Sequence, residues 1–201
     1  MPQPGPVADA EEAIQQCCKR NAYEEAATLI LETYGDQIFG FLVSRLRNRP
    51  DAEEVFSIFS EDLWKGLPGF GWRCSVLAWS YILARNAERR FHRGGRRAIA
   101  LSDAPSVLAV AERVRTSTLP FIKTEIKDKF RALRDRLTEE EQLLLILRVD
   151  KGLRWQDVAS VLNEEAGADA RDVARARKRF QLVKEKLRQL GEAEGLLPSS
   201  Q

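Results

Sequence analysis

Apolar residues recur three or four positions apart along most of the chain, which is the periodicity of an amphipathic helix. The first long stripe begins at Tyr23 and continues through Leu29, Ile30, Tyr34, Ile38, Phe41, Leu42 and Leu46. Asn48-Arg49-Pro50 is expected to end this helix and to begin the next, because proline fits the first turn of a helix. The second helix then has a buried stripe made of Val55, Phe56, Phe59 and Leu63.

A glycine-rich loop over residues 66–71 separates the second helix from a third, which runs from Val76 to about His92. We therefore predict one compact helical unit over residues 23–93. Residues 1–22 are predicted to form a flexible start and a short helix over residues 11–20, since the first ten positions hold three prolines and a glycine. Residues 94–120 are predicted to form a linker, interrupted by a helical piece around Val107 to Val114.

A second helical unit is predicted over residues 121–192, followed by a tail over residues 193–201. Its first helix covers Phe121 to Leu137, and Thr138-Glu139-Glu140-Glu141 has the pattern of a capping box that starts another. A short helix follows from the spacing of Trp155, Val158, Ala159 and Leu162. A long basic helix runs from about Ala170 to Leu190. The predicted fold is all-α, with two small helical domains joined by a linker.

Composition supports a helical, well-packed protein. Of the 201 residues, 44% are hydrophobic and 31% are charged, so a sizeable core can form. The net charge of +2 conceals two strongly basic segments. The first consists of Arg85, Arg89, Arg90, Arg93, Arg96 and Arg97, with Glu88 as its one acid. The second runs from Arg171 to Arg188. Such segments indicate a polyanionic partner, although solvated helix faces would have the same composition.

The chemistry-bearing residues do not indicate an enzyme or a metal protein. Cys17, Cys18 and Cys74 lack the spacing of a disulfide framework or, with His92, of a metal site, so free thiols in a reducing cytoplasm are expected. We expect no cofactor. One histidine and no motif for nucleotide phosphates or catalytic metals argue against an enzyme that acts on nucleic acid. No apolar run is long enough for a signal peptide or a membrane helix, which predicts a cytoplasmic protein without a membrane partner.

The end of the second unit has the order of a helix-turn-helix motif: a short helix, a turn and a longer basic helix. In this motif the second helix lies in the major groove, where arginine can bind guanine edges and phosphates. The predicted DNA contacts on that helix are Arg171, Arg175, Arg177, Lys178 and Arg179. An amphipathic helix of an ordinary bundle remains the alternative interpretation of this segment.

Aromatic and arginine residues are interleaved near the third helix of the first unit. Exposed rings that stack on bases, next to cations that neutralise phosphates, are typical of sites for single-stranded nucleic acid. Trp79 lies on the apolar face and is expected to pack in the core, whereas Trp72 lies in or beside the loop and is a better candidate for exposure.

Two motifs in each unit resemble the extracytoplasmic-function (ECF) sigma factors. The segment 51–64, DAEEVFSIFSEDLW, is similar to the region 2 motif DAEDLVQETFLRAW of that family, and WSYILARN at 79–86 is similar to the family's TWLYRIARN. In the second unit, residues 137–148 and 152–162 resemble the two parts of region 4. The resemblance covers about Tyr23 to Leu190, apart from the linker.

The resemblance implies a sigma factor that loads the core of RNA polymerase onto promoters for transcription initiation. The clamp helices of the largest polymerase subunit would be contacted by Asp51, Glu53, Glu54, Phe56 and Asp62. Recognition and melting of the −10 element would involve Trp72, Arg73, Arg85, Asn86, Arg89, Arg90 and Arg93. The last helix would read the −35 element, and region 4 would meet the flap of the polymerase. An anti-sigma factor is a common further partner in the family.

The turn before the last helix departs from the family pattern. The stretch from Asn163 to Arg175 is about six residues longer than G-I-S-x-G-T-V when Ala176 is aligned with the family's valine. Either the last helix begins early or the loop is larger. The alternative function is a helix-turn-helix transcriptional regulator that does not bind polymerase, in which the helix over residues 51–64 serves the core alone.

Overall fold

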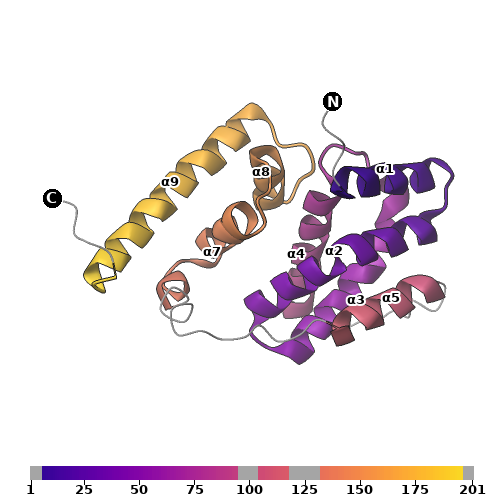
Figure 1. Cartoon of the computed structure of the whole chain (residues 1–201), viewed down its shortest axis with the longest axis horizontal. Helices are drawn as coiled ribbons and strands as arrows, with labels where there is room; N and C mark the ends of the chain where they lie inside the picture. Colours follow the sequence, from indigo (N-terminus) through magenta and orange to yellow (C-terminus); the bar gives the residue numbers. More distant parts are fainter. Residues whose placement is uncertain (1–5, 95–103, 118–131, 197–201) are drawn as a thin grey trace. The chain divides into compact units, whose positions relative to one another are not determined.

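The computed structural model describes residues 6–94, 104–117 and 132–196, and every regular element within these ranges is a helix. This confirms the predicted all-α class (Figure 1). The chain divides into two compact units, which we call unit 1 (Met1–Leu119) and unit 2 (Pro120–Gln201). Each unit is described by itself below.

Unit 1 begins with two antiparallel helices, α1 (Pro6–Lys19) and α2 (Tyr23–Leu46). Helix α1 starts at Pro6, earlier than the predicted residue 11, and proline suits a first helical turn. The Ile14 side chain is fully buried, so this helix is anchored to the unit by its apolar face. Helix α2 has the predicted bounds and is continuous through both of its glycines.

Helix α3 (Arg49–Gly66) and helix α4 (Val76–His92) complete the centre of unit 1. The Asn48 side chain accepts a hydrogen bond from the Asp51 amide and caps α3, as the Asn-Arg-Pro sequence predicts. A single helical turn, η1 (Leu67–Gly69), follows α3. Fully buried rings join the helices edge to face: the Phe39 and Phe56 centroids are 5.3 Å apart, and those of Phe41 and Tyr81 are 5.0 Å apart.

Helix α5 (Pro105–Ser117) lies in the segment that was predicted to be a linker, and it packs on α2 and α3. Its buried face consists of Val107, Val110, Ala111 and Val114, and Ala104 directly before the helix is also buried. A methyl group added at Gly35 would lie 2.9 Å from Val114 Cγ2, so α2 and α5 approach closely only because residue 35 has no side chain. The helical piece expected around 107–114 is therefore a fixed part of unit 1.

Unit 2 contains α7 (Glu139–Leu145), the π-helical turn η3 (Ile146–Asp150), α8 (Trp155–Asn163) and α9 (Ala170–Ala193). The capping box of α7 is confirmed: the Thr138 amide donates to Glu141 Oε2 at 2.8 Å, and the Glu141 amide donates to Thr138 Oγ1 at 3.3 Å. Most of the helix predicted over residues 121–137 lies outside the described residues.

Helix α9 begins at Ala170, ahead of Ala176, and Asp169 and Asp172 form a second capping box at its start. Of the two ways to place the extra residues before Ala176, the early start of the helix is therefore the one observed. The buried residues of this long helix are Ala176, Val183 and Gly191. Most of its surface is left to polar and charged side chains.

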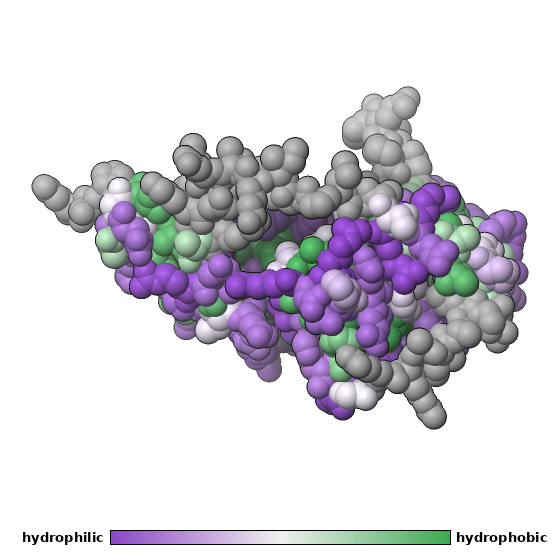
Figure 2. All heavy atoms as spheres, turned by 90° about the horizontal axis from the view of Figure 1, so that it is seen from below, coloured by the Kyte–Doolittle hydropathy of each residue, from purple (hydrophilic) through white to green (hydrophobic). Residues whose placement is uncertain are grey.

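Hydrophilic residues dominate the face drawn in Figure 2, and apolar groups appear on it as small separate areas. Within the described ranges, no helix is both long enough and apolar enough to cross a membrane.

Candidate functional site

Helix α4 carries most of the residues predicted to contact −10 DNA, and its first turn is held by two side chains. The Ala78 amide donates to Ser75 Oγ at 3.1 Å, and the Val76 amide donates to Glu11 Oε1 of α1 at 3.1 Å. Two amides that the helix itself leaves without acceptors are satisfied in this way. Packing of α1 therefore contributes to the placement of α4.

A buried ion pair fixes the second half of α4 against α2. Arg45 Nε donates to both carboxylate oxygens of Glu88, at 2.8 and 3.1 Å, and the two side chains are only 14% and 8% exposed. Sequence reasoning did not assign a role to Glu88. The sequence does contain a sign of this role: Glu88 is the one acid among the arginines of this segment. It lies four residues after Ala84 and seven after Tyr81, on the face of the helix that points toward the core.

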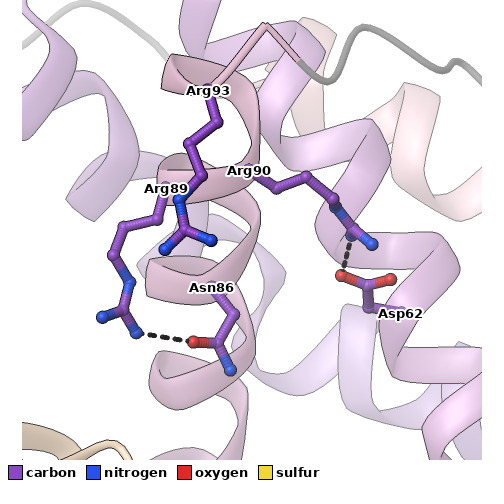
Figure 3. Close-up of a pocket in the computed structure, with 5 residues that line it drawn as sticks. All are labelled: Asp62, Asn86, Arg89, Arg90 and Arg93. Carbon is purple, nitrogen blue, oxygen red and sulfur yellow. Dashed lines mark hydrogen bonds and ion pairs between the residues drawn. The ribbon is translucent and has the colours of Figure 1, made fainter.

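The outer face of the last two turns of α4 forms an open pocket of about 360 Å³. It is lined by Asp62, Asn86, Arg89, Arg90 and Arg93 (Figure 3). Positions 86, 89, 90 and 93 share a face because residues three, four and seven apart lie one above another on a helix. Four of the predicted −10 contacts are thus brought together in one strongly basic site.

Two hydrogen-bonded contacts organise the side chains of this pocket (Figure 3). Arg89 Nη2 donates to Asn86 Oδ1 at 2.8 Å, and Arg90 Nη2 forms an ion pair with Asp62 Oδ2 of α3. Asp62 was predicted to contact polymerase, but it lies among the residues predicted to contact DNA. Burial raises the pKa of the Asp62 carboxyl above its ordinary value, although the neighbouring Arg90 acts in the opposite direction.

The loop before α4 holds a stack of three aromatic rings. The Phe70 centroid is 4.4 Å from that of Trp79, with the two rings nearly parallel, and 4.8 Å from that of Trp72. Trp79 is buried, as predicted, whereas Trp72 is half-buried at the outer end of the stack. Trp72 has a φ of 56°, in the left-handed region that bulky residues rarely adopt. This conformation holds its ring against Phe70 rather than free in solvent.

The remaining predicted −10 contacts do not line the pocket. Arg73 is exposed in the loop beside Trp72, and Arg85 is half-buried on α4. The loop and the pocket lie at opposite ends of α4, so about ten residues at 1.5 Å each place them roughly 15 Å apart. Unit 1 therefore presents an aromatic end and a basic end along one helix.

The residues predicted to contact polymerase are divided between the surface and the core of unit 1. Three of them are partly exposed near the start of α3: Asp51, Glu53 and Glu54. Glu53 forms an ion pair with Arg49 at 2.9 Å. The prediction for Phe56 is wrong, because this ring is fully buried and no partner can reach it. Phe56 faces inward since it belongs to the apolar stripe of α3.

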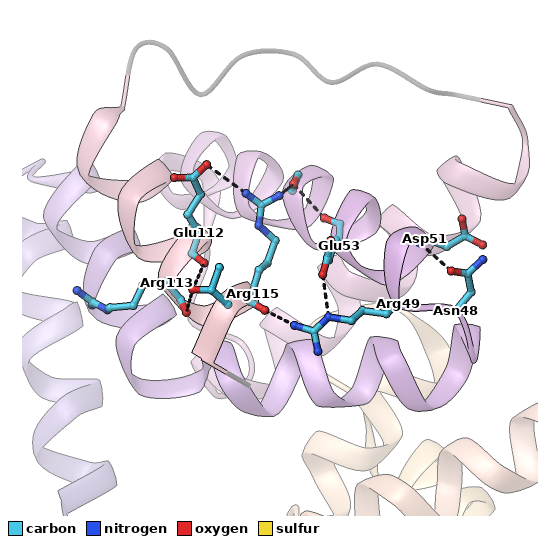
Figure 4. Close-up of polar contacts among 9 residues, drawn as sticks. Asn48, Arg49, Asp51, Glu53, Glu112, Arg113 and Arg115 are labelled. Atoms are coloured by element: carbon cyan, nitrogen blue, oxygen red, sulfur yellow. Dashed lines mark hydrogen bonds and ion pairs between the residues drawn. The ribbon is translucent and has the colours of Figure 1, made fainter. Parts of the chain in front are cut away.

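Helix α5 covers one side of α3 through polar contacts that flank its apolar face (Figure 4). Arg115 Nη1 donates to Ser57 Oγ at 2.9 Å, and Arg49 Nη2 donates to the Arg115 carbonyl oxygen. Ser57 is therefore held by α5, whereas Asp51 and Glu54 lie on α3 without such a contact from α5 among the described residues.

The basic residues of α9 differ in their surroundings, and several form ion pairs with acidic side chains. Arg175 forms an ion pair with Asp172 at 3.1 Å, and Arg179 with Glu140 of α7. For the exposed side chains of Arg171 and Lys178, the described residues supply no ion pair or hydrogen bond. The predicted −35 contacts thus form an exposed basic surface along α9 and do not converge on one pocket.

Trp155 at the start of α8 forms a cluster that sequence reasoning missed. The guanidinium carbons of Arg148 and Arg177 lie 4.8 and 5.8 Å from its ring centroid, and the Phe180 ring meets it edge to face at 5.4 Å. Arg177, a predicted DNA contact, is therefore also a packing residue that joins α9 to α8. The sequence gives little indication of this cluster, because the cluster forms only when α8 packs against α9.

Within the described residues, no group of three or more histidine, cysteine or acidic side chains is placed to hold a metal ion. Cys17, Cys18 and Cys74 form no disulfide with one another; Cys17 is buried, and Cys18 and Cys74 are half-buried. Comparisons of the chain with protein-family models, with curated proteins and with solved structures found no significant match.

Proposed function

We propose that this chain is a sigma factor of the ECF type, which directs the core of RNA polymerase to specific promoters. In this proposal unit 1 binds the polymerase and recognises and melts the −10 element, and the helix-turn-helix of unit 2 binds the −35 element. The observation that carries the proposal is the pocket on α4, where Asn86, Arg89, Arg90 and Arg93 converge.

The chemistry of the pocket suits a nucleic-acid strand. Guanidinium groups bind phosphate oxygens through paired N–H donors, and the Asn86 amide has both a donor and an acceptor for a base edge. The aromatic stack that ends in the half-buried Trp72 lies at the other end of the same helix, and it offers a ring face to an unpaired base. A strand laid along α4 would meet both features.

The basic surface of α9 suits duplex DNA. Its exposed cations lie on a helix that is preceded by the short helix α8, which is the arrangement that places a second helix in the major groove. Exposed Arg171 and Lys178 lie in the first half of α9, which is the half that approaches base edges in this motif.

The decisive experiment is run-off transcription with core RNA polymerase on a library of promoters. The expected result is selective transcription from promoters with two defined elements. A pull-down with the core then tests the partly exposed acids of α3: Asp51→Lys with Glu54→Lys should abolish the complex. Glu12→Lys, a single charge reversal on the exposed surface of α1, is the control and should leave the complex intact. Absence of a complex, or a complex that the α3 variant leaves unchanged, would contradict the proposal.

The alternative function is a helix-turn-helix regulator that does not bind polymerase. One observation favours it: α5 packs against α3 and holds Ser57, which reduces the surface of α3 that a polymerase subunit could contact. A regulator of this kind would bind duplex DNA through α9 and would leave transcription by the core unchanged in the run-off assay.

A further inference from the structure

The pocket on α4 contains an acid that does not suit a site for nucleic acid. Asp62 projects from α3 and forms an ion pair with Arg90, which is one of three arginines that line the pocket (Figure 3). A carboxylate repels the phosphates of a bound strand, and it occupies donors that those phosphates would use. Asp62 therefore opposes the binding of a nucleic-acid strand to this pocket.

The carboxylate and a phosphate are interchangeable partners for Arg90. A guanidinium group presents parallel N–H donors that match the oxygens of either anion. The Asp62 and Arg90 side chains are 24% and 50% exposed, so solvent and solutes reach the pair. Ion pairs with this degree of exposure are weak, which allows a stronger anion to replace the carboxylate.

We propose that Asp62 is a built-in phosphate mimic: it occupies Arg90 in the free protein, and a backbone phosphate of single-stranded DNA displaces it on binding. The choice of single-stranded DNA as the ligand rests on the proposed function. Competition from the Asp62 carboxylate lowers the affinity of the pocket for every strand by the same factor. Binding at this end of α4 then needs additional contacts, which the aromatic end of the same helix is placed to supply.

The surroundings of Asp62 favour this exchange. The charged groups that act on it are Arg90 from α4 and Glu61 and Lys65 on its own helix. Burial raises the pKa of the Asp62 carboxyl in spite of Arg90, so the charged form is less well stabilised here than in water. Moving the carboxylate into solvent therefore costs little free energy, and Arg90 then becomes available to a phosphate.

The experiment measures binding of a fluorescent single-stranded oligonucleotide to the full chain by anisotropy over a range of salt concentrations. Asp62→Asn keeps the shape of the side chain and removes its charge. We expect it to bind about fivefold more tightly than the parent protein. The log–log salt slope should stay close to that of the parent protein, because Arg90 contacts one phosphate in both complexes.

Two further variants separate the proposal from a general effect of net charge. Glu32→Gln removes an exposed acid that pairs with Arg113 at 2.8 Å elsewhere in unit 1, and it should leave oligonucleotide affinity unchanged. In Arg90→Ala, the additional change Asp62→Asn should give a much smaller gain in affinity, because it then removes only the repulsion between the carboxylate and the phosphates. An equal gain in the Glu32 variant, or an undiminished gain without Arg90, would overturn the proposal.

Inorganic phosphate tests the source of the anion. At matched ionic strength it should displace the oligonucleotide no better than chloride does, since one isolated phosphate lacks the contacts of a strand. Preferential displacement by phosphate would overturn the assignment to DNA.

Core polymerase is not needed for these binding measurements. A failed run-off assay would therefore refute the sigma proposal, and the exchange at Arg90 would still be decided by oligonucleotide binding.

Discussion

Both units carry many arginines, but the two units place them in different ways. In unit 1, residues on one face of α4 converge on a pocket, and the helix beneath them is fixed by a buried ion pair and by close packing. In unit 2, the cations are distributed along α9, which buries few of its residues and has ion pairs at its surface. A convergent arrangement can distinguish one ligand geometry from another, whereas a distributed one mainly supplies attraction for a long polyanion.

The largest expected effect concerns the ion pair that fixes α4. Glu88→Gln leaves the Arg45 guanidinium buried without its countercharge, which should lower the free energy of unfolding of unit 1 by about 3 kcal/mol. The measurement is urea unfolding followed by tryptophan fluorescence, in a Trp155→Phe background so that the remaining tryptophans all belong to unit 1.

The matched control for this prediction is an ion pair of unit 2. Arg136 and Glu194 are 2.9 Å apart and about half exposed, so Glu194→Gln should change the stability of unit 2, measured by hydrogen exchange of the α9 amides, by no more than about 0.5 kcal/mol. Similar losses in the two variants would remove the distinction between a fixed α4 and a loosely held α9.

A smaller effect is expected where α5 meets α2. Gly35→Ala places a methyl group 2.9 Å from Val114 Cγ2, and the resulting overpacking should outweigh the better helix propensity of alanine, for a net loss of about 1 kcal/mol. Gly40→Ala is the control, because a methyl group there meets nothing within 4 Å and should stabilise α2 by about 0.5–1 kcal/mol. The same urea assay measures both.

A double-mutant cycle makes this test specific to α5. Val114→Ala alone should destabilise unit 1, but in the Gly35→Ala background it should cost less, since it removes the clash. Additive effects would show that α5 does not pack tightly on α2 in solution.

The smallest expected effect distinguishes paired from unpaired cations on α9. Lys178→Ala should reduce the log–log salt slope of duplex DNA binding by about 0.9, the value for one lost phosphate contact. Arg179→Ala should reduce it less, because Arg179 is already neutralised by Glu140 in the free protein. Anisotropy with a labelled duplex measures both slopes, and two unchanged slopes would exclude these residues from the DNA interface.

Local structure was largely predictable from the sequence, because local interactions determine it. The break between α2 and α3 follows from Asn48 and Pro50, and the start of α7 follows from the Thr138–Glu141 capping box. The convergence of Asn86, Arg89, Arg90 and Arg93 also follows from their spacing on one helix.

Features that depend on contacts between helices were not predictable in this way. Asp62 joins the α4 pocket only because α3 packs beside α4, and Trp155 meets Arg177 only because α8 packs against α9. Residues 105–117 resembled a linker because of their flanking sequence, but their small apolar residues fit against α2. The inclusion of Phe56 among surface residues followed from the resemblance to a family motif, although the residue's place in the apolar stripe already indicated burial.

The close approach of α2 and α5 has an evolutionary consequence. Because the side chains at positions 35 and 114 compete for the same space, substitutions at the two positions are not independent. In related sequences that retain α5, we expect glycine at the first position to accompany a branched residue at the second, and a larger residue at the first to accompany alanine or glycine at the second. This pair would therefore mark, from sequence alone, which relatives have the same helix in place of a simple linker.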